Sequence, residues 1–180
     1  MTLELEQWQY PIGRYCPKKT YTLAEIKAAI EVIGAFPSAL METLDKCALH
    51  DLIEPYRPGG WTIKQLVHHL ADSHMHAYIR CKYAFLEDTP SIKGYAEKDW
   101  AEASPDATTV EIDASLSILK GIHRRWSYFF TQLTPKDFKR EYDHPERKEN
   151  FSLAEVVCFY AWHSTHHLEH IKQYLKYQKK

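Results

Sequence analysis

The stretch that decides the fold reads Trp61-Thr62-Ile63-Lys64-Gln65-Leu66-Val67-His68-His69-Leu70-Ala71-Asp72-Ser73-His74-Met75-His76. Thr62 and Gln65 have the spacing of a capping box, which predicts that a helix begins here. At about 100° of rotation per residue, the apolar side chains that follow share one sector of this helix, as far as about Glu87. His69 borders that sector. The stretch therefore predicts an amphipathic helix that carries a histidine toward the protein interior.

Three more amphipathic helices are predicted elsewhere in the chain, over about residues 22–47, 113–133 and 152–177. Thr22 with Glu25, and Ser152 with Glu155, repeat the capping-box spacing. Pro37 marks a candidate bend in the first of these helices. Four long helices with apolar faces are typical of a four-helix bundle, so we expect an all-α fold.

The connections between these helices differ in length. Residues 1–20 contain Pro11 and Pro17 and are expected to form an extended arm, and residues 89–112 form a long connection. Residues 139–142 are expected to pair with the segment around Asn150 as a small hairpin. Because no internal repeat or low-complexity stretch divides the chain, we expect residues 1–180 to form a single domain.

The composition excludes several classes of partner. The 180 residues carry a formal charge of −1, whereas binding to nucleic acid or to an anionic membrane surface needs a clustered excess of lysine and arginine. No stretch approaches the roughly 18 apolar residues of a membrane span, and the N-terminus does not resemble a signal peptide, so we expect a cytoplasmic protein. The four cysteines are scattered, and we expect them to be reduced.

A second histidine-rich stretch lies in the last predicted helix and reads Trp162-His163-Ser164-Thr165-His166-His167-Leu168-Glu169-His170. His163 and His167 lie about 40° apart around the helix axis and about 6 Å apart along it, so both imidazoles can reach one ion. A third ligand must come from elsewhere, and His69 is the natural donor. Three imidazoles leave a coordination position open, as in a catalytic site. We therefore predict a metal site at His69, His163 and His167.

The other polar residues of the two stretches are interpreted from their direction. His68 is about 100° from His69 and should face outward or toward a neighbouring helix. Candidates to orient a ligand through its second ring nitrogen are His166, His170, Asp72 and Glu169, although a solvated surface charge is the simpler interpretation of the two carboxylates. Candidates for a general base are His74, His76, His166 and Asp72.

These motifs resemble those of a known family. The resemblance is carried by Pro55-Tyr56-Arg57-Pro58-Gly59-Gly60-Trp61-Thr62, His68-His69-Leu70-Ala71-Asp72-Ser73-His74 and Trp162-His163-Ser164-x-His166-His167. They are similar to the DinB-like four-helix-bundle proteins, and among these to the YfiT-type metal-dependent hydrolases. Position by position, the resemblance implies that His69, His163 and His167 bind one divalent ion per chain, zinc or nickel, in a homodimer.

The resemblance fixes the site better than the reaction, and three functions stay open. The leading hypothesis is hydrolysis of a small-molecule substrate by a metal-bound water. The second is transfer of a low-molecular-weight thiol to an electrophile, for which Arg57, Arg80 or Lys82 would bind a carboxylate of the thiol. The third is a metal-binding bundle without catalysis, which a fourth protein ligand would favour.

Overall fold

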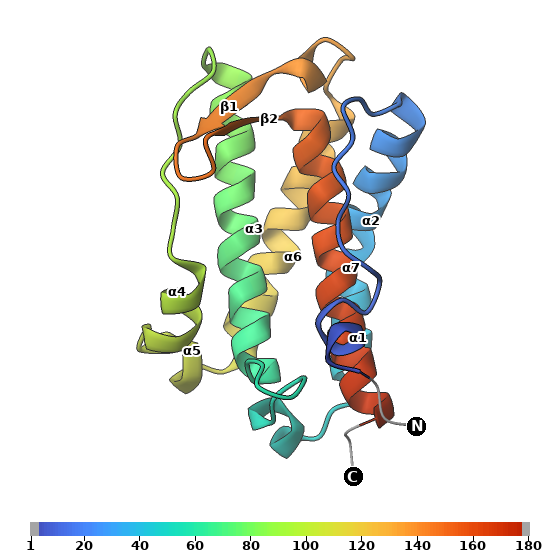
Figure 1. The fold of residues 1–180 in the computed structure, drawn as a ribbon, viewed down its shortest axis with the longest axis vertical. Coiled ribbons are helices and arrows are strands. Elements are labelled where there is room, and N and C mark those ends of the chain that lie inside the picture. Colours follow the sequence, from blue (N-terminus) through green and yellow to red (C-terminus); the bar gives the residue numbers. More distant parts are fainter. Residues whose placement is uncertain (1–3, 178–180) are drawn as a thin grey trace.

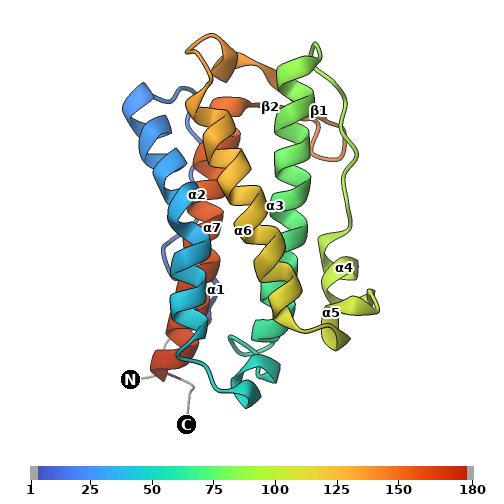
Figure 2. The ribbon, with the colours of Figure 1, turned by 180° about the vertical axis from the view of Figure 1, so that it is seen from behind.

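Four long helices form the protein, and they lie side by side in both views of the molecule (Figure 1 and Figure 2). The computed structural model describes residues 4–177. The long helices are α2 (Leu23–Leu44), α3 (Ile63–Leu86), α6 (Ile112–Thr131) and α7 (Leu153–Tyr177). α2 packs against α6 and α7, and α3 packs against the same two helices. The predicted all-α four-helix bundle is confirmed.

Three of the four long helices, α2, α3 and α7, begin at their predicted caps. Thr22 Oγ1 accepts a hydrogen bond from the backbone N–H of Glu25 at 3.2 Å, and Thr62 Oγ1 accepts one from Gln65 at 3.1 Å. Pro37 lies inside α2. Because proline has no N–H, the carbonyl four residues before it loses its helical partner.

The N-terminal arm is only partly extended, which corrects the prediction for residues 1–20. Leu5–Gln9 form a short helix, α1, that packs against α7, while residues 1–3 lie outside the described part of the chain. The buried Trp8 ring meets the Tyr177 ring edge-on at 6.0 Å. This tertiary contact stabilises a helix that is too short to show a periodic pattern. The rest of the arm runs beside α7 (Figure 1).

Short elements fill the connections. They are the strands β1 (Glu141–His144) and β2 (Glu149–Ser152), the helices α4 (Glu97–Ala103) and α5 (Asp106–Thr109), and short 3₁₀ helices at Leu49–Ile53 and Asp137–Lys139. β1 and β2 pair antiparallel, so the predicted hairpin is confirmed. α4 and α5 lie in the long connection of residues 89–112, for which the sequence predicted no helix. Both pack against α3.

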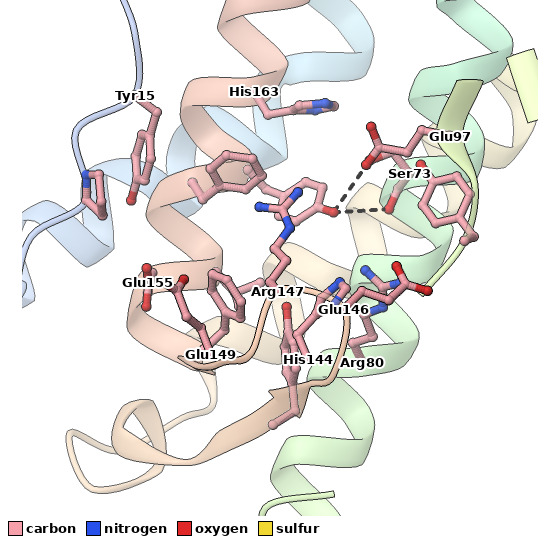
Figure 3. A pocket seen from close by; sticks show the side chains of 17 residues that line it. Tyr15, Ser73, Arg80, Glu97, His144, Glu146, Arg147, Glu149, Glu155 and His163 are labelled. Atoms are coloured by element: carbon pink, nitrogen blue, oxygen red, sulfur yellow. Dashed lines mark hydrogen bonds between the residues drawn. The ribbon is translucent and has the colours of Figure 1, made fainter. Parts of the chain in front are cut away.

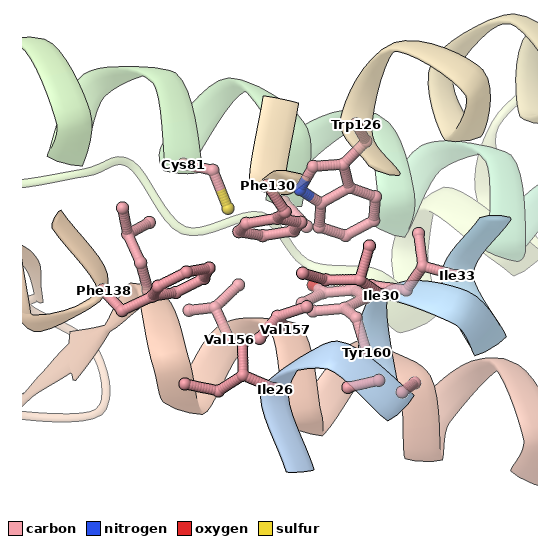
Figure 4. Packing of buried hydrophobic residues seen from close by; sticks show 14 of the residues in the cluster. Ile26, Ile30, Ile33, Cys81, Trp126, Phe130, Phe138, Val156, Val157 and Tyr160 are labelled. Atoms are coloured by element: carbon pink, nitrogen blue, oxygen red, sulfur yellow. The ribbon is translucent and has the colours of Figure 1, made fainter. Parts of the chain in front are cut away.

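The apolar interior consists of two clusters. Figure 4 shows the first apolar cluster, which includes Ile33, Trp126 and Phe130. The second apolar cluster includes Leu119 and Ile171. Both include large side chains that are almost completely buried, and the burial of apolar surface is the main source of stability of the bundle.

A layer of buried histidines lies beside these clusters. Their rings contact one another in one continuous set, which we call the histidine layer: His69, His74, His123, His163, His166, His167 and His170. On α6, His123 stands between Leu119 of the second cluster and Trp126 of the first. The polar layer is therefore inserted into the apolar core.

No helix within residues 4–177 is both long and apolar enough to cross a membrane. The four cysteines are free thiols, as predicted. Burial raises the pKa of the Cys81 thiol to about 12, which makes this residue an inert part of the core.

Candidate metal centre

Three histidines from two helices meet inside the bundle. One ring nitrogen from each of His69 on α3 and His163 and His167 on α7 lies within 4.8 Å of the other two. The side chains are buried, with 4%, 8% and 8% of their surface exposed. The structure thus brings together the three residues that the sequence predicted as ligands.

Burial keeps these imidazoles neutral. Desolvation lowers the pKa of His69 to about 4 and holds the pKa of His163 and of His167 well below the usual value. For the last two, repulsion from neighbouring histidines adds to the effect of burial. A neutral imidazole keeps a lone pair for a metal, so the three residues have the ligating form at neutral pH.

The donor set of this group consists of imidazoles alone. Within residues 4–177, no cysteine, aspartate or glutamate belongs to it. Imidazole nitrogen suits zinc, nickel, copper and iron. Three protein ligands leave a position for water or substrate on a tetrahedral ion. The residues therefore fit a metal site of the catalytic type.

A second group of histidines shares His167 with the first. His166, His167 and His170 also bring ring nitrogens within 4.8 Å of one another. His170 Nδ1 lies 3.4 Å from His167 Nδ1, and His170 Nε2 lies 3.3 Å from the carbonyl oxygen of Gln9. His170 thus lies where an orienting residue would, whereas His166 Nδ1 has no hydrogen-bond partner within the described residues.

His68 turns toward a neighbouring helix, which is one of the two directions predicted for it. Its Nε2–H donates to the carbonyl of Val110 at 3.1 Å, so its Nδ1 accepts from the Ser115 hydroxyl at 2.7 Å. Both ring nitrogens are engaged away from the three central histidines. His68 is therefore a structural histidine of the α3–α6 contact.

The general-base candidates lie in different surroundings. His74 is fully buried, and both of its ring nitrogens contact other histidines, so no substrate reaches it. His76 lines a separate cavity between α3 and the α3–α4 connection. His166 is buried beside His167, with its ring centroid 5.0 Å from that of His167.

The two candidate carboxylates also differ. Asp72 is half-buried, and burial raises its pKa to about 6. Glu169 accepts a hydrogen bond from Lys172 Nζ at 2.7 Å in an ion pair on the outer face of α7. The surface interpretation of Glu169 therefore holds, whereas Asp72 is more enclosed than a solvated charge.

A cavity of about 300 Å³ lies beside His163 (Figure 3). His163 is on one side of it, and His144, from the hairpin, is on the opposite side. Its aromatic wall includes Tyr15, Tyr142, Phe159 and Tyr160. Its charged lining consists of Arg80, Glu97, Glu146, Arg147, Glu149 and Glu155. A small molecule in this cavity would lie next to one of the three central histidines.

Sequence reasoning missed His123 and the hairpin side of the cavity. His123 is fully buried, and its ring centroid lies 4.9 Å from that of His74. A lone histidine on an apolar helix face is usually satisfied by a single carbonyl, so it gave no metal-ligand spacing to recognise. Its position between Leu119 and Trp126 was the one signal available in the sequence.

Comparison with known proteins agrees with the resemblance seen in the sequence. The model of the DinB superfamily matches residues 34–171. "Putative metal-dependent hydrolase YfiT" of Bacillus subtilis is 41% identical over 164 residues, which are 91% of this chain and 92% of that protein. A relative of the same description from Oceanobacillus iheyensis is 41% identical over 168 residues, 93% of this chain and 96% of that protein.

A solved structure is similar over almost the whole chain. It is YfiT from Bacillus subtilis, described as a probable metal-dependent hydrolase with an unusual four-helix bundle topology. The TM-score is 0.91 at 38% sequence identity, with 97% of this chain and 99% of that chain covered. The fold and the sequence together show that the chain belongs to the DinB superfamily.

Proposed function

We propose that the protein is a metal-dependent hydrolase that holds one divalent ion on His69, His163 and His167. The observation that carries the proposal is the juxtaposition of three buried, neutral imidazoles with a cavity that reaches one of them. The description of the relatives as metal-dependent hydrolases supports the same class. The cavity favours a catalytic role over that of a metal-binding bundle without turnover.

The bound ion would supply a water of lowered pKa, near 7, and polarise an oxygen of the substrate. The chain's own residues hold it without neutralising it, because imidazoles are uncharged ligands. Since His163 lines the cavity, a substrate bound there lies beside the coordination sphere. The half-buried Trp61 ring packs against the His69 ring, with their centroids 4.9 Å apart.

The cavity suits a small polar substrate. About 300 Å³ is the lower end of the range for small-molecule sites. The Tyr160 hydroxyl lies 3.4 Å from Ser73 Oγ, and the buried guanidinium of Arg80 donates from Nη2 to the Lys93 carbonyl at 2.9 Å. These groups provide polar contacts within an aromatic wall, so we propose a compact ester, amide or lactone with a polar substituent.

The test is a screen of esters, amides and lactones with the full chain loaded with zinc or nickel, in the absence of thiol. We expect hydrolysis that rises with pH through about 7 and that is lost in His163→Ala. His68→Ala is the matched control, because His68 is a buried histidine next to His69 on α3 whose ring nitrogens bond to Val110 and Ser115. Hydrolysis that persists in His163→Ala would refute the proposal.

A metal-dependent thiol transferase is the second candidate, and Arg80 is the observation that favours it. Of the three cations considered for the carboxylate of a thiol, Arg80 lines the cavity. Lys82 lies over the Phe129 ring and Arg57 over the Tyr56 ring, and neither lines the cavity. A transferase would consume an electrophile only with added thiol, and Arg80→Met would raise its KM for the thiol. Thiol-dependent turnover without hydrolysis would replace the first proposal.

We also propose the homodimer and the single ion per chain that family membership implies. Light scattering of the purified protein should give twice the mass of the chain. Metal analysis should give one ion per chain. A monomeric mass would refute the proposed dimer. It would not affect the proposed metal site, because His69, His163 and His167 all come from one chain.

A further inference from the structure

We propose that two hydrogen-bonded chains of histidine side chains fix the ring proton of both α7 ligands on Nδ1. The Nε2 lone pairs of these two ligands are then directed to the ion. Each chain ends on a backbone carbonyl, and its other members are positioning residues. The chains are His163–His74–His123–Ile33 carbonyl and His167–His170–Gln9 carbonyl. The inference rests on the metal site of the proposed function and is independent of the reaction.

The direction of the first chain is set at its far end. A carbonyl oxygen accepts only, so His123 donates its Nδ1–H to the Ile33 carbonyl at 2.6 Å. A neutral imidazole has one ring proton, so His123 Nε2 is an acceptor. His74 Nδ1 lies 2.7 Å from that nitrogen and therefore donates to it.

The same argument reaches the ligand. With its proton on Nδ1, His74 has a lone pair on Nε2, which lies 3.0 Å from His163 Nδ1. His163 therefore donates from Nδ1 and keeps its lone pair on Nε2. A carbonyl of α2 thus determines which nitrogen an α7 ligand offers, through residues on α6 and α3.

Pro37 leaves free the Ile33 carbonyl on which the first hydrogen-bonded chain ends. In a regular helix, the N–H of residue 37 would bond to the carbonyl of Ile33, but Pro37 has no N–H. A buried carbonyl without a partner costs free energy. The His123 Nδ1–H supplies a hydrogen bond to this carbonyl in place of the missing backbone N–H. Pro37 therefore exposes the acceptor that His123 uses.

The second chain ends at the C-terminus of α1. The last carbonyls of a helix have no helical partner, and Gln9 is the last residue of α1. His170 donates its Nε2–H to this carbonyl at 3.3 Å, so its Nδ1 accepts from His167 Nδ1 at 3.4 Å. The short helix in the N-terminal arm therefore takes part in orienting His167.

The second chain also decides between the two histidine groups. His167 carries its proton on Nδ1 and has one lone pair, on Nε2. It cannot offer its Nδ1 lone pair to an ion on His166 and His170 at the same time. The arrangement therefore favours one ion, at His69, His163 and His167.

Burial makes the proton positions strict. His74 and His123 are both 0% exposed, so water cannot replace a histidine as hydrogen-bond partner. Full burial disfavours the charged form of both rings, and desolvation lowers the pKa of His123 to about 4. An unpaired ring nitrogen at this depth would cost free energy.

The direct test is which ring nitrogen carries the proton. Two-bond ¹H–¹⁵N correlation spectra of the ¹⁵N-labelled full chain should be recorded with and without zinc. We expect the proton on Nδ1 of His74, His123, His163 and His167, and on Nε2 of His170. A proton on Nε2 of His74 or His123 would overturn the inference. Because these two rings report without zinc, its failure is distinguishable from failure of the metal proposal.

The second test is zinc affinity in His123→Phe. Phenylalanine fills a similar volume among the same apolar neighbours but removes both hydrogen bonds, so we expect a 10- to 100-fold weaker zinc affinity, about the usual cost of losing an orienting partner. His68→Phe is the matched control and should bind zinc as the wild type does. Wild-type affinity in His123→Phe would overturn the inference. If His123→Phe fails to fold, the wild-type spectra decide.

Discussion

In the first apolar cluster, around Trp126 and Phe130 (Figure 4), burial itself stabilises the fold, whereas in the adjoining histidine layer burial carries a cost. Apolar surface contributes about 25 cal/mol per Å² when it leaves water. A ring nitrogen that leaves water must instead find a partner. His123 and Trp126 lie one helical turn apart on α6 and exemplify the two cases.

The difference shows which residues the structure specifies by volume and which by chemistry. In the cluster, another apolar side chain of similar size fills the same space at small cost. In the histidine layer, each ring needs the hydrogen-bond partner that its neighbour provides, from the Ile33 carbonyl to His163. The lone pairs left over at the end of these chains are the ones that suit a metal.

The largest expected effect is on stability, in the cluster. Phe130 is 1% exposed, so Phe130→Ala should lower the free energy of unfolding by about 3–5 kcal/mol. The zinc affinity of the folded variant should be unchanged, because the Phe130 ring packs against Trp126, Phe129 and Phe138. Denaturant unfolding and zinc titration of the same sample test both parts. A parallel loss of zinc affinity would mean that the two regions are coupled.

The reverse pattern is expected for a ligand. His167→Ala should weaken zinc binding by more than about 100-fold, the upper end of the cost of losing an orienting partner. The metal-free variant should unfold cooperatively, since the apolar clusters are intact. His68→Ala is the control and should bind zinc normally. Full zinc occupancy in His167→Ala would remove this residue from the site.

Low pH should destabilise the protein through its histidine layer, because the buried histidines can bind protons and the apolar side chains of the two clusters cannot. The pKa of His69 and of His123 is lowered to about 4, and the pKa of His170 to about 3, in each case mainly by burial. The unfolded chain therefore binds more protons than the folded chain from about pH 6.5 downward. Stability of the metal-free protein should fall as pH drops below 6.5, by about 1.4 kcal/mol per pH unit for each such histidine.

The zinc-loaded protein should lose its additional stability over the same range, because protons compete with the ion for imidazole. Thermal unfolding of both forms from pH 8 to pH 4 measures the two curves. We expect them to converge as the pH falls. A constant gap between them down to pH 4 would mean that histidine does not bind the ion.

The smallest effect is expected at the surface of α7. Glu169 is paired with Lys172 and does not belong to either histidine group. Glu169→Gln should therefore change the free energy of unfolding by less than about 1 kcal/mol, as is usual for an exposed ion pair. Zinc affinity should not change. A clear loss of zinc affinity would show that Glu169 orients a ligand and belongs with the histidine layer.

The sequence predicted the parts of the molecule that depend on local spacing. Capping boxes at Thr22 and Thr62 located two helix starts, and periodic apolar residues indicated all four long helices. The four-residue spacing of His163 and His167 predicted that they face one point. Such features need no knowledge of how the helices are arranged.

The features that were missed depend on tertiary contacts. α1 is stabilised by the packing of Trp8 on Tyr177, which are at opposite ends of the chain. The contact of His123 with the Ile33 carbonyl joins α6 to α2. From the sequence alone, Pro37 predicts only a bend, because its effect on that carbonyl matters only once α6 is known to lie beside α2.

A crystal structure of the zinc-loaded chain, with the ion located by its anomalous scattering, would show directly which histidines hold the metal. We expect one ion per chain on His69, His163 and His167, bound by Nε2 of the last two, with water or another small ligand in the remaining position. An ion on His166, His167 and His170, or a fourth protein ligand on the ion, would contradict a three-histidine site with an open position.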